Sequence, residues 1–365
     1  MSAAYLYNYL FLKVILEKRI AVMGAGAIGG YAGAHMARAG HDVTLIDAWP
    51  EHVEAMRRDG LHISGMTPAE TVNLKVNALH ISDVQQVVKQ QPFDIVFMCV
   101  KSYDTVWATH LIKDYLAPGG FVVSLQNCIN EERIADVVGW GKVMGCIASL
   151  IAAELVAPGR VKRTIHLGGA EHIVYRVGEV HGRHTRRAQG VADLLSAADS
   201  SKVTSNLWGE RWSKLVINSM RNGLSAATGL SGNERDGRVD TRRLSIRLGS
   251  EAVRVGQALG FALEEMLGMK AETLARAGEG SGDALSEIEH VLIEGAKGRD
   301  DDQRPSMGQD MFKGRRTETD FINGFVADKG AEIGVPALTH AKMNEAVKRV
   351  ERGEVKAGPD VVKGF

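Results

Sequence analysis

The sequence contains little cysteine, and its cysteines form no recognisable binding pattern. Its 365 residues include only three, Cys99, Cys128 and Cys146, in apolar or loop contexts. Their spacing excludes a disulfide framework and a cysteine metal site, and so few thiols suit a reducing compartment. The 12 histidines are scattered, and no pair shows metal-ligand spacing with a carboxylate. We therefore expect no metal site and a cytoplasmic protein.

An excess of charge of either sign is also missing. Lysine and arginine total 44, and aspartate and glutamate total 44. A balanced chain has no bulk field that would attract nucleic acid or an anionic membrane, so we expect neither as a partner. With 45% hydrophobic and 24% charged residues, the chain has an ordinary globular composition and enough length for two domains.

No apolar segment near the N-terminus is long enough to span a bilayer. Residues 5–16 are apolar, but a membrane helix needs about 20 such residues. The segment also lacks the basic region and the small-residue cleavage site of a signal peptide. We expect residues 1–18 to be an N-terminal extension, which is an extra helix or strand or results from a start codon placed too early.

A glycine-rich segment directly follows the first predicted strand, residues 19–23, and opens a predicted helix that ends at residue 39. Strand, glycine turn and helix are the context in which G-x-G-x-x-G binds a dinucleotide. Gly24 permits the tight turn, Gly26 lets the backbone approach a pyrophosphate, and Gly29 allows close helix packing. The predicted cofactor-binding segment consists of Gly24, Ala25, Gly26, Ala27, Ile28 and Gly29.

The second predicted strand, residues 42–46, ends at Asp47. An acidic residue roughly twenty positions past the glycines can accept hydrogen bonds from both ribose hydroxyls of the adenosine and would repel a 2′-phosphate. No lysine or arginine follows before Arg57. The sequence therefore favours NAD(H) over NADP(H), although His52 or a residue from elsewhere in the chain can still compensate.

Two later strands also end in polar residues. Residues 94–100 form a continuous apolar run, as expected for a parallel strand covered on both faces, and Lys101 follows it. Residues 121–125 repeat this arrangement and precede Asn127. Ligands of open α/β sheets bind beyond the carboxyl ends of the strands, so both side chains are placed to face the nicotinamide half of a dinucleotide. The alternative that each residue only caps a loop stays open.

The remaining β-like runs are expected to complete the same sheet, after which the periodicity becomes helical. We place the domain boundary before residue 205, so the predicted domains are a dinucleotide-binding Rossmann domain and a helical substrate and catalytic domain. The three β-like runs are residues 146–151, 159–167 and 172–177. The predicted Rossmann domain is residues 19–204, and the predicted helical domain is residues 205–365.

One helix of the second predicted domain, residues 211–228, presents a polar face. Lys214, Asn218 and Asn222 recur every four residues, so they stack on one side of the helix. A lysine beside two amides offers a proton donor and two groups that can grip a small oxygen-rich molecule. An ordinary solvated helix face is the alternative.

After residue 19, nearly the whole chain resembles the ketopantoate reductase (2-dehydropantoate 2-reductase) family. The lysine-asparagine helix and a serine followed by Gly-Arg-x-Thr-Glu are the specific parts, since the glycine segment alone fits many dehydrogenases. The matching motifs occur in the family's order: residues 24–29, Lys101, Gln126-Asn127, residues 214–222, Ser306, Gln309-Asp310, residues 314–318 and residues 322–324.

The resemblance implies an N-terminal Rossmann domain, a C-terminal all-α domain and an active site in the cleft between them. It also implies that a nicotinamide hydride reduces a 2-oxo acid, in the first place 2-dehydropantoate (ketopantoate) to pantoate. Lys214 would be the general acid that protonates the carbonyl oxygen, and Glu318 would bind the cofactor ribose or orient the lysine. A homodimer is compatible with the family. The implied substrate-binding residues are Asn127, Asn218, Asn222 and Ser306.

Three departures from the family's pattern are visible. The family usually prefers NADPH and tends to have a basic residue where this chain has Asp47, so NADP(H) remains an alternative cofactor. Cys128 replaces the glycine that commonly follows the substrate-binding asparagine, and residues 261–304 form a longer segment than the family leads us to expect. Two other functions stay open: a hydroxy acid dehydrogenase with a different substrate, and a dinucleotide sensor without turnover.

Overall fold

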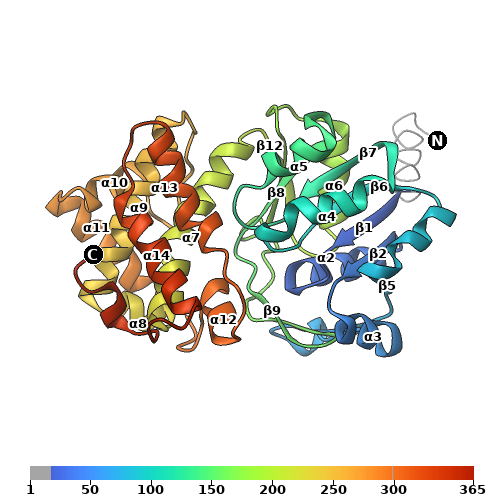
Figure 1. The fold of residues 1–365 in the computed structure, drawn as a ribbon, viewed down its shortest axis with the longest axis horizontal. Helices are drawn as coiled ribbons and strands as arrows, with labels where there is room; N and C mark the ends of the chain where they lie inside the picture. Colours follow the sequence, from blue (N-terminus) through green and yellow to red (C-terminus); the bar gives the residue numbers. More distant parts are fainter. Residues whose placement is uncertain (1–17, 298) are drawn as a thin grey trace. The chain divides into compact units, whose positions relative to one another are not determined.

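The computed structural model describes residues 18–297 and 299–365. The chain divides into two compact units, Met1–Leu207 and Trp208–Phe365. Figure 1 shows a sheet with covering helices in the first unit and only helices in the second. The predicted boundary between residues 204 and 205 lies close to this division. Apart from Lys18, the predicted extension at residues 1–18 lies outside the described residues.

The sheet unit is built on an eight-stranded sheet, in which β5, β2, β1, β6, β7 and β8 are neighbours and run parallel. This is the strand order of a Rossmann fold, and its direction of winding reverses between β1 and β6. At the far edge β11 pairs antiparallel with β8, and β12 pairs parallel with β11. The bounds in sheet order are β12 (Ser201–Thr204), β11 (Tyr175–Glu179), β8 (Val143–Ala148), β7 (Leu116–Ser124), β6 (Phe93–Met98), β1 (Arg19–Met23), β2 (Asp42–Asp47) and β5 (Asn77–His80).

Helices cover both faces of this sheet, as the continuous apolar runs predict. Alternate residues of β1 enter opposite cores: Ile20 packs into one cluster and Ala21 into the other. The first cluster also holds side chains of α2 (Ala27–Arg38) and α6 (Arg186–Leu195), and the second holds side chains of α4 (Thr105–Lys113) and α5 (Glu131–Val138). The prediction of an N-terminal Rossmann unit followed by a helical unit is confirmed.

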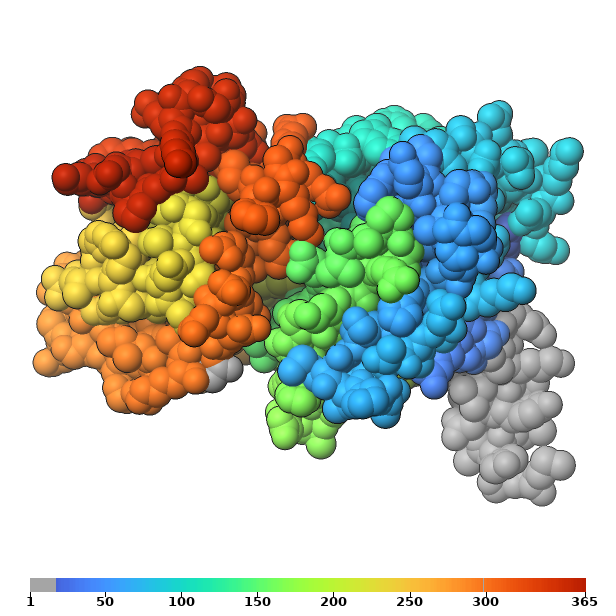
Figure 2. Space-filling model, turned by 90° about the horizontal axis from the view of Figure 1, so that it is seen from below, coloured from blue at the N-terminus to red at the C-terminus, as the bar shows by residue number. Residues whose placement is uncertain are grey.

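One predicted strand belongs to a different sheet. The run at residues 159–167 does not extend the main sheet; it contains β10 (Arg160–Arg163), which pairs with β3 and β9 in a four-stranded sheet. Figure 2 shows the green segment that carries β9 and β10 beside the blue segment that carries β3 and β4. Exposed and buried residues alternate along β10, which is the pattern of a strand covered on one face only. The other strands of this sheet are β4 (Val72–Leu74), β3 (Leu61–Ser64) and β9 (Ala153–Ala157).

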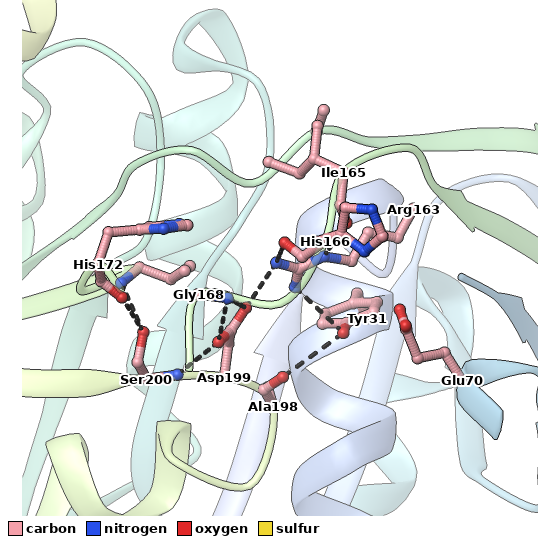
Figure 3. A network of polar contacts seen from close by, with 12 residues as sticks. Tyr31, Glu70, Arg163, Ile165, His166, Gly168, His172, Ala198, Asp199 and Ser200 are labelled. Carbon is pink, nitrogen blue, oxygen red and sulfur yellow. Dashed lines mark hydrogen bonds and ion pairs between the residues drawn. The ribbon is translucent and has the colours of Figure 1, made fainter. Parts of the chain in front are cut away.

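A buried ion pair ties this second sheet to the main one (Figure 3). Arg163 at the end of β10 lies 2.5 Å from Asp199, just before β12, and both side chains are almost fully buried. Asp199 also accepts hydrogen bonds from the backbone N–H of Gly168 and Ser200. Burial opposes ionisation, but these hydrogen bonds and the Arg163 charge hold the pKa of Asp199 below its ordinary value. A carboxylate and a guanidinium removed from water are tolerated here because each is hydrogen-bonded.

The helical unit is arranged around α7 and α9, which pack closely because α9 carries glycines at the contact. A Cβ on Gly249 would lie 2.7 Å from the Met220 sulfur of α7, and one on Gly256 would lie 2.3 Å from the Trp212 ring. Trp212 donates a hydrogen bond from Nε1 to the carbonyl of Ala252 at 2.8 Å. The helices of this unit are α7 (Leu207–Thr228), α8 (Gly232–Gly237), α9 (Val239–Ala258), α10 (Ala271–Gly278), α11 (Gly282–Glu294), α12 (Ser306–Phe312), α13 (Asn323–Glu332) and α14 (Leu338–Glu351).

Asn323 connects three of these helices. Its side-chain Nδ2 donates to the carbonyl of Ser219 on α7 at 3.0 Å and lies 3.1 Å from Nδ1 of His340 on α14. A Cβ on Gly223 would lie 2.4 Å from the Asn323 Oδ1, so this glycine makes room for the amide. The Ile-Asn-Gly motif therefore has a packing role here. Within the described residues, no helix has both the length and the apolar character needed to cross a membrane.

Candidate functional site

In the sheet unit, the candidate site is built at the carboxyl ends of the parallel strands, beginning with the glycine turn after β1. Gly24 has φ 96°, and a Cβ there would lie 2.7 Å from the Val100 nitrogen. A Cβ on Gly29 would lie 2.1 Å from the Gly24 oxygen, so α2 can pack this closely on β1 only with glycine. The position above Gly26 is open, with no atom within 4 Å of a Cβ built there. This geometry leaves room for a phosphate at the amino end of α2.

His52 holds the glycine turn in place through a hydrogen bond to the Ala25 carbonyl. The side chain is fully buried, and its Nδ1 accepts a hydrogen bond from the Gly159 N–H at 2.8 Å. Nε2 therefore carries the proton and donates to the Ala25 carbonyl at 2.9 Å. The alternative that His52 compensates for a missing basic residue at a 2′-phosphate is wrong, because both ring nitrogens are engaged inside the protein.

Asp47 is the last residue of β2 and is partly exposed. One carboxylate oxygen accepts a hydrogen bond from the Trp49 N–H at 2.9 Å, which holds the side chain at the end of the strand. The first basic residue downstream is committed elsewhere: Arg57 pairs with Glu54 at 2.8 Å and with Asp83 at 2.6 Å.

Lys101 and Asn127 lie after the adjacent strands β6 and β7, and both are partly buried. The two strand ends are linked by Gln126, which donates from Nε2 to the Val100 carbonyl and to the Thr105 hydroxyl, each at 2.8 Å. Asn130 adds a second link because its Nδ2 donates to the Asn127 carbonyl and the Ser102 hydroxyl. The structure thus gathers the glycine turn, Asp47, Lys101 and Asn127 at one edge of the sheet.

In the helical unit, the predicted polar face is present on α7. Lys214 and Asn218 are partly buried, whereas Asn222 is 3% exposed. The Nδ2 of Asn218 is buried and has no hydrogen-bond partner among the described residues. The opposite side of α7 is apolar, with Trp212, Val216 and Met220 buried. A buried amide donor without an acceptor is unfavourable unless a ligand or a water molecule supplies the acceptor.

Ser306 and Glu318 come from segments near the carboxyl half of the helical unit. Ser306 is the first residue of α12, which packs on α7: a Cβ on Gly308 would lie 2.5 Å from the Ser225 hydroxyl. Glu318 is 2% exposed, and the preceding residue is held by a hydrogen bond from the Thr317 N–H to Glu351 at 2.5 Å. Ser306 therefore lies on a helix that packs against α7, and Glu318 lies in a buried segment that follows this helix.

The positioning residues His52, Gln126 and Asn130 were not predicted from the sequence to support the site. Gln126 was visible as part of the family motif, but its role in bridging two strand ends depends on strand order. His52 carries no sequence signal for its role because its partners are backbone groups far away in the chain. Within the described parts of the chain, no group of three or more His, Cys, Asp or Glu residues is arranged to hold a metal ion.

Comparison with known proteins places this chain in a family. The family model for "Ketopantoate reductase PanE/ApbA" matches residues 20–175, and the model for its C-terminal part matches residues 206–351. The 2-dehydropantoate 2-reductase of Archaeoglobus fulgidus is 30% identical over 338 residues, covering 92% of this chain and 99% of the relative.

Solved structures agree with this relationship. A PanE/ApbA family ketopantoate reductase from Ralstonia eutropha JMP134 is 28% identical, with a TM-score of 0.74 over 92% of this chain and 99% of that chain. D-mandelate dehydrogenase with NADH and anilino(oxo)acetate has a TM-score of 0.75 over the same shares, but at 22% identity it shows a common fold only. The matches over both units establish that the chain belongs to the ketopantoate reductase family of oxidoreductases.

Proposed function

We propose that the protein reduces a 2-oxo acid to the 2-hydroxy acid, with 2-dehydropantoate as the first candidate substrate. The observation that carries this proposal is the polar face of α7, where the buried Asn218 amide lacks an acceptor beside Lys214 and Asn222. An oxygen-rich ligand would supply that acceptor. Family membership and the 2-dehydropantoate 2-reductase activity named for the relative from Archaeoglobus fulgidus support the same reaction.

In this proposal Lys214 is the general acid. A nicotinamide cofactor, when bound, supplies the hydride that adds to the carbonyl carbon. Negative charge then develops on the carbonyl oxygen, and the Lys214 ammonium stabilises that charge and donates the proton. Asn218 and Asn222 donate hydrogen bonds to substrate oxygens, and the Ser306 hydroxyl adds another.

Glu318 and the sheet-unit residues complete the proposed machinery. Glu318 would accept hydrogen bonds from the cofactor ribose or hold the Lys214 ammonium in place. Residues 24–29 would hold the pyrophosphate, since the open position at Gly26 lets a phosphate approach the backbone. Lys101 and Asn127 would face the nicotinamide half, and Asn127 would also hold a substrate oxygen.

For the cofactor we propose a preference for NAD(H). The Asp47 carboxylate lies at the end of β2, where the adenosine ribose of a Rossmann cofactor binds. The side chains that would otherwise neutralise a 2′-phosphate are occupied: Arg57 pairs with two carboxylates and His52 is buried.

The deciding assay measures the absorbance of the reduced nicotinamide in the presence of ketopantoate and either NADH or NADPH. A parallel panel tests other 2-oxo acids with reduced cofactor and 2-hydroxy acids with oxidised cofactor. Oxidation of NADH by ketopantoate is the expected result. Faster oxidation of NADPH would keep the reaction and reject the cofactor preference. Turnover only on the panel would reject ketopantoate as the substrate, and cofactor binding without any turnover would favour a sensor.

We also propose that the protein is a homodimer. The ketopantoate reductase of Staphylococcus aureus, which shares this fold at 15% identity, is described as dimeric. Light scattering coupled to gel filtration would measure the mass directly, and a monomer mass at micromolar concentration would reject the proposal.

A further inference from the structure

The helical unit contains a buried cluster of charge beside α7. On α8, Arg235 donates from Nε and Nη2 to both carboxylate oxygens of Asp236, at 2.8 and 2.7 Å. Arg299 adds a third hydrogen bond to the same carboxylate, at 2.9 Å. Arg235 is 1% exposed and Asp236 is fully buried. One negative charge is thus shared by two guanidinium groups.

Arg221 of α7 brings a third guanidinium to this cluster. Burial, followed by the positive charge of Arg235 and of Arg299, lowers the pKa of Arg221 to about 9, while Asp236 acts in the opposite direction. The group therefore stays protonated at neutral pH. Its Nε is buried and has no hydrogen-bond partner among the described residues. The cluster holds three guanidinium groups, of Arg221, Arg235 and Arg299, against the single carboxylate of Asp236.

Arg221 and Arg299 are only partly buried, but an excess of positive charge withdrawn from water is still unfavourable unless an anion compensates it. Arg235 and Arg299 already donate to Asp236, so Arg221 is the member of the cluster with an open donor. The other unpartnered donor on this side of α7 is the Nδ2 of Asn218, three residues earlier and therefore on the same helix face. A ligand that supplies oxygen atoms would satisfy both donors on this face, and a negative ligand would also offset the positive charge.

We propose that Arg221 binds the carboxylate of the substrate, with the Asn218 amide beside it. This inference rests on the proposed reduction of a 2-oxo acid and adds an orientation to it. Arg221 follows Lys214 by seven residues, which places their Cα atoms about 10 Å apart along the same side of α7. The substrate carbonyl lies at the Lys214 end, and the carboxylate lies toward α8 and the start of α12. The planar guanidinium matches the two oxygens of a carboxylate, as the lysine ammonium does not.

The test combines two substitutions with two forms of the substrate, using the enzyme with bound cofactor. Arg221→Gln removes the charge but keeps a polar side chain, and Arg221→Lys restores the charge without the forked donor. For a reducible 2-oxo acid we expect Arg221→Gln to raise KM about 10- to 100-fold with a much smaller change in kcat, because the lost contact is a charge-assisted hydrogen bond. Arg221→Lys should recover part of this loss. The methyl ester of the same acid should be used poorly by the wild type and equally poorly by Arg221→Gln.

Arg243→Gln is the matched control, because Arg243 also lies in the helical unit but is 58% exposed and its nearest carboxylate is Glu289. It should leave KM unchanged. An acid-to-ester preference that survives in a folded Arg221→Gln enzyme, as judged by circular dichroism, overturns the inference.

A binding measurement separates this inference from the proposed function. Oxamate, a carboxylate that this chemistry does not reduce, is titrated calorimetrically into wild type and Arg221→Gln with bound cofactor. Binding that depends on Arg221 supports the carboxylate site even if no 2-oxo acid is turned over, in which case only the proposed function fails. Equal binding by the two proteins, or binding by neither, overturns the carboxylate site whatever the activity assay gives.

Discussion

Lys214 projects from a helix whose other side is packed into the core by Trp212, Val216 and Met220. Because the backbone position is fixed by these contacts, removing the ammonium should change the chemistry and leave the fold intact. We expect Lys214→Ala to lower kcat by about 10²- to 10⁴-fold, the usual contribution of a positioned acid. NADH binding, followed by its fluorescence, should be retained because the predicted dinucleotide residues lie in the other unit.

Lys270→Ala provides the control for this variant, since Lys270 is exposed in the same unit. It should have wild-type turnover. If Lys214→Ala retained most of its activity in the presence of saturating substrate, the general-acid role would have to be assigned to another group.

Asp47 offers a second test at the scale of one side chain. Asp47→Arg replaces an acceptor of ribose hydroxyls by a cation that attracts a 2′-phosphate, so the ratio of kcat/KM for NADPH to that for NADH should rise by about 10-fold or more. Asp47→Asn removes the repulsion without adding a cation and should give an intermediate ratio. An unchanged ratio in both variants would show that Asp47 does not contact the cofactor.

At this scale the sequence is informative wherever a residue type is tied to a local geometry. Gly24 and Gly29 were predicted to serve a tight turn and close packing, and a Cβ at either would meet backbone atoms. His52 could not be assigned from the sequence because its role depends on Gly159, which is distant in sequence. The sequence places Arg221 next to Asn222. It does not show the excess of positive charge around Arg221, because Arg235 and Arg299 come close to it only in the folded chain.

At the scale of elements, the contact between α7 and α9 depends on glycine. A Cβ on Gly256 would lie 2.3 Å from two atoms of the buried Trp212 ring, which cannot move without losing its hydrogen bond to Ala252. We expect Gly256→Ala to lower the free energy of unfolding by about 1 to 3 kcal/mol, because overpacking outweighs the better helix propensity of alanine. Urea unfolding followed by circular dichroism measures this change.

Gly282→Ala is the matched control for this contact. Gly282 is the first residue of α11, and a Cβ built there meets no atom within 4 Å. The substitution should be neutral or slightly stabilising. A Gly256→Ala protein as stable as the control would mean that α7 and α9 can separate without loss.

Element types were easier to predict than their partners. The periodicity identified the strands β1, β2, β6, β7, β8 and β11 of the main sheet and the change to helices after about residue 205, since both signals are local. The short strands β3, β4, β5 and β9 were not predicted. The sheet to which a strand belongs is decided by distant segments, and the run at residues 159–167 was assigned wrongly for this reason. Its alternating burial is that of a strand covered on one face, and its partners are β3 and β9.

At the scale of the whole molecule, each unit buries a histidine, and these histidines make the stability of the protein depend on pH. Burial lowers the pKa of His35 in the sheet unit and of His340 in the helical unit to about 4. His340 is held neutral from both sides, because its Nδ1 accepts from the Asn323 amide and its Nε2 donates to the Leu248 carbonyl at 2.8 Å. A proton on Nδ1 would face another donor.

The sign of the resulting pH dependence is fixed by which state takes up the proton first. The unfolded chain, with a histidine pKa near 6.5, binds the proton before the folded chain does, so stability present above pH 6.5 is lost as the pH falls toward 4. For the fully buried His340 the loss approaches about 3 kcal/mol.

Urea unfolding at a series of pH values, followed by tryptophan fluorescence and circular dichroism, measures the slope of the free energy of unfolding against pH. His340→Gln should reduce this slope, whereas His290→Gln, at an exposed position, should not. If the free energy of unfolding had the same pH slope in the wild type and in His340→Gln, His340 would become protonated without opening the core. The neutral, hydrogen-bonded His340 would then not be the group that links stability to pH in this range.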